Sequence, residues 1–397
     1  MQDTPEFAQM QTLLFPLLAC GVFVLIHILI YFLLVRSISH RLWLSRVYAC
    51  VLWGNMLLCI GYMCMRSFAI APKWLFFAMS ISVGVAFSFL IAAFIAMFIN
   101  IMLFIFRKPQ HLTTKVKRAI LALCFVYSGY ALYHGLEQPT IKRASLELNG
   151  LEESLRVAQI SDVHIGGLID STRTAQIVHL LNGENPDVIV ITGDFVDTKL
   201  ENALEGLEIF KALRAKYGVY YVLGNHEYLY DIEAILSKLK HLNITPLINE
   251  TIIIWHKVES ASSNSKKAKQ RPFVNISGAT DLMGNRMKIY RPDFAASLAH
   301  READIPTIFL THQPKAIEYL NKHQLKSIDF IFSGHTHGGQ IFPFSLAVLA
   351  QQPFLKGLHK LDGGGYIYVS EGTGFWGPPM RAFSNSEIAV FDFLPPK

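Results

Sequence analysis

The sequence predicts an α-helical membrane anchor followed by an α/β domain. Hydrophobic residues make up 52% of the 397 residues and charged residues only 17%, whereas soluble domains carry about 25% charged residues. The apolar excess is concentrated in the first third of the chain, and short β-branched runs alternating with amphipathic stretches follow it. We therefore expect residues 1–143 to form an anchor of about four transmembrane helices and residues 144–397 to form the α/β domain.

Four apolar runs between basic clusters predict the spans of the anchor, at residues 12–35, 47–65, 74–106 and 119–134. A span needs about 20 such residues, and we interpret the third run as one tilted helix. All five cysteines lie at or before Cys124. The α/β domain therefore has neither a disulfide nor a thiolate metal ligand.

Basic residues between the runs predict an orientation in the membrane. Eight of them flank one side of the four runs and four flank the other. Loops rich in Lys and Arg stay in the cytoplasm, so both termini and the α/β domain are expected outside it. The eight are Arg36, Arg41, Arg46, Arg107, Lys108, Lys115, Lys117 and Arg118, and the four are Arg66, Lys73, Lys142 and Arg143.

Nine strands and five helices are expected in the α/β domain. The strands are predicted at 155–161, 187–192, 218–223, 250–255, 273–278, 306–311, 328–333, 365–370 and 387–393. The helices are predicted at 172–182, 200–216, 231–242, 291–302 and 315–323. The polar residues 258–272 are interpreted as a surface loop.

Five of these strands end in short motifs that contain Asp, Asn or His. Each motif alone is common turn chemistry. Together they place hard and borderline ligands at the strand ends, where open α/β sheets bind their ligands. Carboxylate, amide oxygen and imidazole suit manganese, iron or zinc, and one carboxylate can bridge two ions. The motifs are Asp162-Val163-His164, Gly193-Asp194-Phe195-Val196-Asp197, Gly224-Asn225-His226-Glu227, Thr311-His312-Gln313 and Gly334-His335-Thr336-His337-Gly338.

The order of these motifs resembles the calcineurin-like metallophosphoesterase superfamily over residues 155 to about 393. Gly338 to Gln340 and residues 371–381 (EGTGFWGPPMR) resemble a membrane-anchored, mainly bacterial subfamily. The resemblance implies a four-layer α/β/β/α sandwich, a phosphoesterase activity and two divalent metal ions. It also implies a location in a bacterial inner or plasma membrane.

Carried over by position, the resemblance implies a role for each motif residue. Asp162, His164 and His337 would hold one ion, Asn225, His312 and His335 would hold the other, and Asp194 would bridge them. His226 would face the phosphate, and Asp197 would orient His226. A bridging hydroxide would attack phosphorus in line. Arg381 would add positive charge, or it would be a surface or salt-bridge residue, and Glu227 is interpreted as a turn residue.

Three other functions remain open from the sequence. A nuclease is disfavoured because residues 136–397 carry a net charge of −2, so no nucleic-acid partner is expected. A cytoplasm-facing lipid pyrophosphatase, similar to the UDP-2,3-diacylglucosamine pyrophosphatases, requires the opposite orientation. A catalytically inactive membrane scaffold is opposed by the complete set of motifs.

An apolar segment after His337 bears on whether the substrate is linked to a lipid. Its large side chains belong either to the domain core or to the membrane interface. In the second case, membrane lipids would contact the segment, and a phosphate ester on a lipid or lipid-linked carrier could reach the site. The residues are Phe342, Phe344, Leu346, Val348, Leu349, Phe354 and Leu355, followed by Lys356, His359 and Lys360.

Overall fold

The computed structural model of the chain describes residues 5–36, 38, 41–65, 71–258 and 269–396. The chain divides into a helical unit, Met1–Leu136 with Gly377–Arg381, and an α/β unit, Glu137–Trp376 with Ala382–Lys397. This division falls a few residues before the expected one. It also assigns five residues from near the carboxyl terminus to the helical unit.

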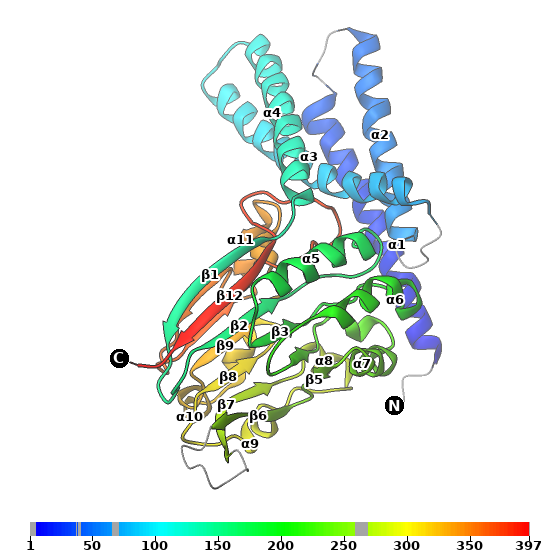
Figure 1. Cartoon of the computed structure of the whole chain (residues 1–397). Coiled ribbons are helices and arrows are strands. Elements are labelled where there is room, and N and C mark those ends of the chain that lie inside the picture. The colour runs from blue at the N-terminus through cyan, green and yellow to red at the C-terminus, as the bar shows by residue number, and fades with distance from the viewer. Residues whose placement is uncertain (1–4, 37, 39–40, 66–70, 259–268, 397) are drawn as a thin grey trace. The chain divides into compact units, whose positions relative to one another are not determined.

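The helical unit contains four long apolar helices (Figure 1). They are α1 (Pro5–Ile30, extended by the π-helical turn η1, Tyr31–Val35), α2 (Leu42–Met65), α3 (Lys73–Ile105) and α4 (Gln110–Leu136). Each is long and apolar enough to cross a membrane, which confirms the four predicted helices. The third run is one continuous helix of 33 residues. Arg66 lies outside the described residues.

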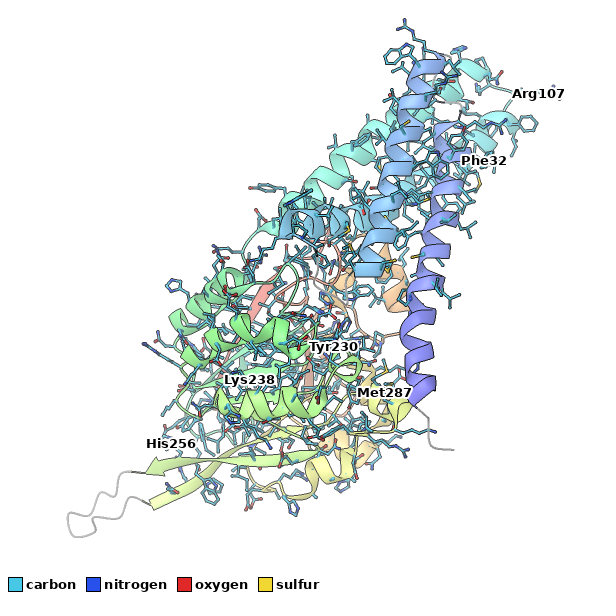
Figure 2. The ribbon with its side chains drawn as sticks, turned by 90° about the vertical axis from the view of Figure 1, so that its right-hand side faces the viewer. Phe32, Arg107, Tyr230, Lys238, His256 and Met287 are labelled. Atoms are coloured by element: carbon cyan, nitrogen blue, oxygen red, sulfur yellow. The ribbon has the colours of Figure 1, made fainter. Side chains whose placement is uncertain are left out.

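Large apolar side chains on these helices face outward, among them Phe32, labelled in Figure 2 with Arg107. Small and medium side chains such as Ala93 and Leu121 form the interior of the helical unit. Exposed Leu57, Phe104 and Val126 suit a lipid environment, where apolar surface needs no protein cover.

The α/β unit contains two six-stranded sheets (Figure 1). The strand order of the first is β1 (Thr140–Glu147), β12 (Glu387–Leu394), β2 (Leu155–Ile160), β3 (Val188–Thr192), β4 (Val219–Val222) and β5 (Ile244–Pro246). The order of the second is β10 (Gly357–Lys360), β11 (Tyr366–Val369), β9 (Phe330–Ser333), β8 (Thr307–Leu310), β7 (Lys269–Gly278) and β6 (Glu250–Val258).

Strand alternation shows how the layers stack. Val188 and Val190 belong to a cluster that joins the two sheets, whereas Ile189 and Ile191 face a second cluster with the first set of helices. In the other sheet, Phe330 faces the first sheet and Ile331 faces the second set of helices. Successive strand residues point to opposite faces, so both faces of both sheets are covered. The predicted four-layer α/β/β/α sandwich is confirmed.

The outer layers consist of short helices. The first set is α5 (Ser171–Gly183), α6 (Leu200–Glu208), the 3₁₀ turn η2 (Ile209–Ala212) and α7 (Ile232–His241). The second is α9 (Phe294–Ala299), the 3₁₀ turn η4 (Pro314–Tyr319) and α10 (Lys322–Lys326). The remaining turns are η3 (Glu227–Leu229), α8 (Met283–Met287), η5 (His337–Gly339) and α11 (Phe344–Leu349).

All nine expected strands are present, and β1, β5 and β10 are additional. The prediction of an α-helix at 315–323 is wrong for most of that range. The 3₁₀ turn η4, which begins at Pro314, lies there instead. Strands β6 and β7 extend into the expected loop at 258–272, and residues 259–268 of that loop lie outside the described part of the chain.

Candidate metal centre

The candidate metal ligands follow the ends of five strands. Strands β2, β3 and β4 are parallel neighbours in the first sheet, and β8 and β9 are parallel neighbours in the second. Their carboxyl ends therefore present the residues that follow them at one edge of each sheet. Asp162 and His164 follow β2, Asp194 follows β3, Asn225 follows β4, His312 follows β8, and His335 and His337 follow β9.

The structure brings these side chains together in overlapping groups. Possible ligand atoms of Asp162, His164 and His337 lie within 4.8 Å of one another, as do those of Asp194, His312 and His335. A third such group contains His164, Asp194 and His226. The first two groups match the two ligand sets that the resemblance implied, apart from Asn225, and Asp194 is shared between groups.

Asp194 lies where the groups meet. Its Oδ2 is 3.3 Å from Nε2 of His312, 3.8 Å from Nε2 of His226 and 3.9 Å from Nε2 of His164. Its Oδ1 accepts a hydrogen bond from the backbone N–H of His226 (2.8 Å), which fixes the carboxylate plane. Oδ2 is therefore directed at the space between the histidines, as a bridging ligand requires.

The donor set around His312 fits a cation. Nδ1 of His312 contacts the carbonyl oxygen of Thr192 (2.7 Å), so Nδ1 carries the proton of a neutral ring and Nε2 keeps its lone pair. Nε2 then faces Oδ1 of Asn225 at 3.0 Å, Oδ2 of Asp194 at 3.3 Å and Nδ1 of His335 at 3.2 Å. Electron pairs that converge in this way need a positive charge between them. A divalent ion fits that position.

Without an ion, the surrounding carboxylates favour the protonated form of His312. Burial alone would lower the pKa of His312, but Asp194 and Asp162 raise it well above its usual value. On the other side of the cluster, Nε2 of His164 and Nε2 of His337 lie 3.0 Å apart. Two facing imidazole nitrogens also suit a shared cation.

The backbone beneath the cluster is strained. Five of the seven candidate ligands have positive φ, although none is glycine: Asp162 (53°), His164 (54°), Asp194 (48°), His335 (70°) and His337 (50°). Positive φ is uncommon for such side chains and costs about 1–3 kcal/mol per residue. These five strained residues all lie in the ligand motifs, so the cost falls on residues whose side chains form the cluster.

Two glycines allow the backbone to approach the ligands closely. A Cβ on Gly224 would lie 2.1 Å from the backbone nitrogen of Asp194, and one on Gly334 would lie 2.4 Å from Oδ2 of Asp162. Any side chain at these positions would displace a ligand. The Gly-Asn-His-Glu and Gly-His-Thr-His motifs therefore depend on glycine for packing.

His226 is held by a carboxylate outside the ligand groups. Oδ1 of Asp197 lies 2.6 Å from Nδ1 of His226, which is the hydrogen bond predicted from the sequence. The hydroxyl of Tyr230, labelled in Figure 2, donates to the backbone carbonyl of Asp197 (3.0 Å). Burial alone would lower the pKa of His226, but Asp194 and Asp197 raise it to about 9. In the metal-free state His226 is therefore protonated at neutral pH.

Glu227 joins the second and third motifs. Its fully buried carboxylate accepts four backbone N–H bonds: Oε1 from Phe195 (2.7 Å) and Val196 (3.0 Å), and Oε2 from Asp194 (3.2 Å) and Gly224 (2.8 Å). Glu227 does begin a turn, η3, but the interpretation as a turn residue missed this side-chain role. The available signal was the carboxylate at the end of the Gly-Asn-His-Glu motif.

Arg381 belongs to the helical unit. Its side chain is fully buried, and its backbone N–H donates to the carbonyl of Ala131 in α4 (2.8 Å). The interpretation of Arg381 as a surface residue is therefore wrong. Its part in the chemistry stays a prediction.

The apolar segment after His337 is largely exposed. Phe342, Phe344, Leu346 and Leu349 are between 41% and 63% exposed, so core packing does not explain these four. Phe354 is partly buried against the core of the α/β unit.

Taken together, two stacked sheets with a cluster of Asp, Asn and His side chains at their strand ends define a metal-dependent hydrolase of phosphoesters. The sequence pattern of the calcineurin-like phosphoesterases matches residues 155–339. A metallophosphoesterase of Helicobacter pylori is 38% identical over 269 residues, which cover 68% of each chain. One of Campylobacter jejuni is 33% identical, over 69% of this chain and 67% of its own.

The name of a bovine relative describes it as a membrane protein. It is named a transmembrane protein with metallophosphoesterase domain and is 32% identical over 66% of this chain and 59% of its own. The chain described here belongs to the calcineurin-like metallophosphoesterase family. It is a metallophosphoesterase with helices able to span a membrane.

Proposed function

We propose that this chain hydrolyses phosphodiester or pyrophosphate bonds of lipid-linked substrates, with two divalent ions, on the extracytoplasmic face of a membrane. The convergence of three histidines on Oδ2 of Asp194 carries the proposal of a dinuclear centre. Asp162, His164 and His337 would hold one ion, and Asn225, His312 and His335 the other. Manganese, iron and zinc all suit this donor set.

The two ions would lower the pKa of a bridging water and neutralise charge on the phosphoryl oxygens. The chain's own residues supply the rest. Asp197 orients the ring of His226 through Nδ1, so a protonated His226 would stabilise negative charge or protonate the leaving oxygen. Glu227 holds the backbone of Asp194 and thereby the position of the shared carboxylate.

The exposed apolar side chains support a lipid-linked substrate. Phe342 follows the candidate ligand His337 by five residues, which span at most about 18 Å of extended chain. Phe342 packs edge-to-face on Phe383 with a ring separation of 5.7 Å, and Phe383 is 70% exposed. This surface, formed by Phe342, Phe344, Leu346, Leu349 and Phe383, is called the α11 surface below. Acyl chains are its natural partner in a chain with four membrane-capable helices.

The test removes part of the α11 surface. Phe344→Ser with Leu349→Ser should lower kcat/KM for a long-chain lipid phosphate about 30-fold, since two partly inserted side chains contribute together about 2 kcal/mol. Hydrolysis of a soluble aryl phosphodiester and the metal content should not change.

The matched control replaces exposed apolar residues on other elements of the α/β unit, Leu204→Ser with Tyr319→Ser. This control should leave both substrates unaffected. Equal losses on the lipid and soluble substrates in the α11 variant would contradict the lipid-substrate proposal. A panel of phosphomonoesters, diesters and lipid pyrophosphates, assayed with each metal, would identify the substrate class.

A further inference from the structure

Five residues of the loop between β11 and β12 are part of the helical unit. They are Gly377–Arg381, and their backbone bonds to α3 and α4. The carbonyl of Gly377 accepts a hydrogen bond from Oγ of Ser80 (2.7 Å), and the N–H of Arg381 donates to the carbonyl of Ala131 (2.8 Å). Met380 and Arg381 are fully buried.

Small residues on α3 and α4 make room for this segment. Ser80 and Gly84 lie one turn apart on α3, and Ala131 and Gly135 lie one turn apart on α4. A Cβ on Gly135 would lie 2.5 Å from the carbonyl oxygen of Pro379 and 2.7 Å from Cα of Met380. We call these four residues the docking notch.

The notch is specific to these positions. A Cβ on Gly84 would lie 2.3 Å from Sδ of Met380. By contrast, a Cβ on Gly129, also on α4, would meet nothing within 4 Å. The segment therefore occupies the space that side chains at Gly84 and Gly135 would fill. The space beside Gly129 is not occupied by the segment.

The residues that flank the segment belong to the α/β unit and are held by Gln340. The N–H of Trp376 donates to Oε1 of Gln340 and the Nε2 of Gln340 donates to the carbonyl of Trp376, both at 2.9 Å. The N–H of Ala382 donates to the backbone carbonyl of Gln340 (2.8 Å). Gln340 thus holds the base of the loop, three residues after the candidate ligand His337.

Trp376 lies beside the candidate catalytic histidine. Its ring and that of His226 pack edge-to-face, with centroids 6.3 Å apart and an angle of 83° between planes. Trp376 is also 41% exposed. The residue immediately after Trp376 is Gly377, the first residue of the docked segment.

We propose that docking of Gly377–Arg381 in the notch fixes the preceding residue, Trp376, against His226. Trp376 is then a positioning residue for His226. This proposal rests on the proposed phosphoesterase function of the same site. It goes beyond that function by giving the docked segment a role in turnover.

The first experiment compares two glycines of α4 in the full-length protein, purified in detergent. Gly135→Ala should lower kcat on a soluble aryl phosphodiester by roughly tenfold or more, since small misplacements of reacting groups have large effects. The metal content should stay normal. Gly129→Ala is the matched control and should resemble the wild type.

Trypsin gives a readout that needs no activity. The bond after Arg381 should be resistant in the wild type and in Gly129→Ala, because Arg381 is fully buried. It should become cleavable in Gly135→Ala, as mapped by mass spectrometry. Suppose that the wild type resists trypsin at Arg381, as expected, and yet hydrolyses no phosphoester. This result would contradict the proposed function but would still support docking of the segment.

Two combinations test the path through Trp376. Trp376→Ala should reproduce the loss in kcat, Trp376→Phe should retain most activity, and adding Gly135→Ala to Trp376→Ala should cause no further loss. Gly84→Ala, which places a methyl group against Met380, should be rescued by Met380→Ala. The rescue keeps the test decisive even where Gly135→Ala does not fold.

Two results would overturn the proposal. One is equal activity and equal trypsin resistance in Gly135→Ala and Gly129→Ala. The other is an additive loss when Gly135→Ala is combined with Trp376→Ala, because the notch would then act on the site without Trp376.

Discussion

Replacing Glu227 by Gln changes one side-chain oxygen into an NH₂ group and leaves the shape of the side chain intact. In the native chain both oxygens accept, and all four partners are backbone N–H donors. The amide of Gln can keep only one oxygen. Its nitrogen must therefore face two N–H groups, either those of Phe195 and Val196 or those of Asp194 and Gly224.

The expected cost follows from these four bonds. A buried donor without an acceptor costs about 1–3 kcal/mol, so two of them cost about 2–6 kcal/mol. We expect a loss near 3 kcal/mol, which is a large share of the 5–15 kcal/mol that stabilises an ordinary domain. At about 2–4 °C per kcal/mol for a domain of this size, Tm should fall by about 6–12 °C.

Thermal unfolding of the full-length protein in detergent, with and without a chelator, measures this shift. Glu201→Gln, on an exposed residue in the first turn of α6, is the control and should change Tm by less than about 2 °C. The metal content of Glu227→Gln should also fall, because the backbone N–H of Asp194 loses its fixed partner in one of the two orientations. A Tm within 2 °C of the wild type would refute the claim that Glu227 joins the two loops.

Three further predictions concern the metals, the histidine and the topology. The purified protein should bind two divalent ions per chain and lose activity to chelators, and Asp194→Asn should cost more than any change at a single-ion ligand; one bound ion, or full activity in Asp194→Asn, would contradict the dinuclear centre. His226→Ala should lower kcat by roughly 10²–10⁴ at nearly normal metal content, whereas loss of metal would make His226 a ligand, as its group with His164 and Asp194 allows. Reporter fusions after residues 40, 110 and 397 should lie inside, inside and outside the cytoplasm; a cytoplasmic carboxyl terminus would contradict the proposed orientation and favour the cytoplasm-facing lipid pyrophosphatase.

The buried strands could be predicted because parallel strands covered on both faces form continuous apolar runs. Val188–Thr192 is such a run, and all five of its residues are buried. Strand β1 gives no such pattern, since Thr140–Glu147 lies at the edge of its sheet and contains exposed and half-buried residues only. Strand β5 has three residues, which is too short for any periodicity to show.

The candidate ligands could be predicted for a related reason. Each one follows a recognisable strand within a few residues, so the local sequence already indicates the edge at which it lies. The bonds of Glu227 to Phe195 and Val196 could not be predicted, because the partners are about thirty residues away and are backbone groups with no sequence signature. The burial of Arg381 against α4 likewise depends on packing between segments distant in the chain.

The position of β12 sets an order of events during synthesis. This strand, Glu387–Leu394, is made long after β1 and β2, and it lies between them with pairing on both sides. Until it leaves the ribosome, β1 has no neighbour in its sheet and one edge of β2 is open, an arrangement that invites pairing with other chains. The four membrane-capable helices α1 to α4, in contrast, are complete more than 200 residues earlier. The membrane-capable helices of the nascent chain are therefore complete well before its hydrolase sheet can close, and a truncation just before β12 should leave an aggregation-prone product that keeps these helices.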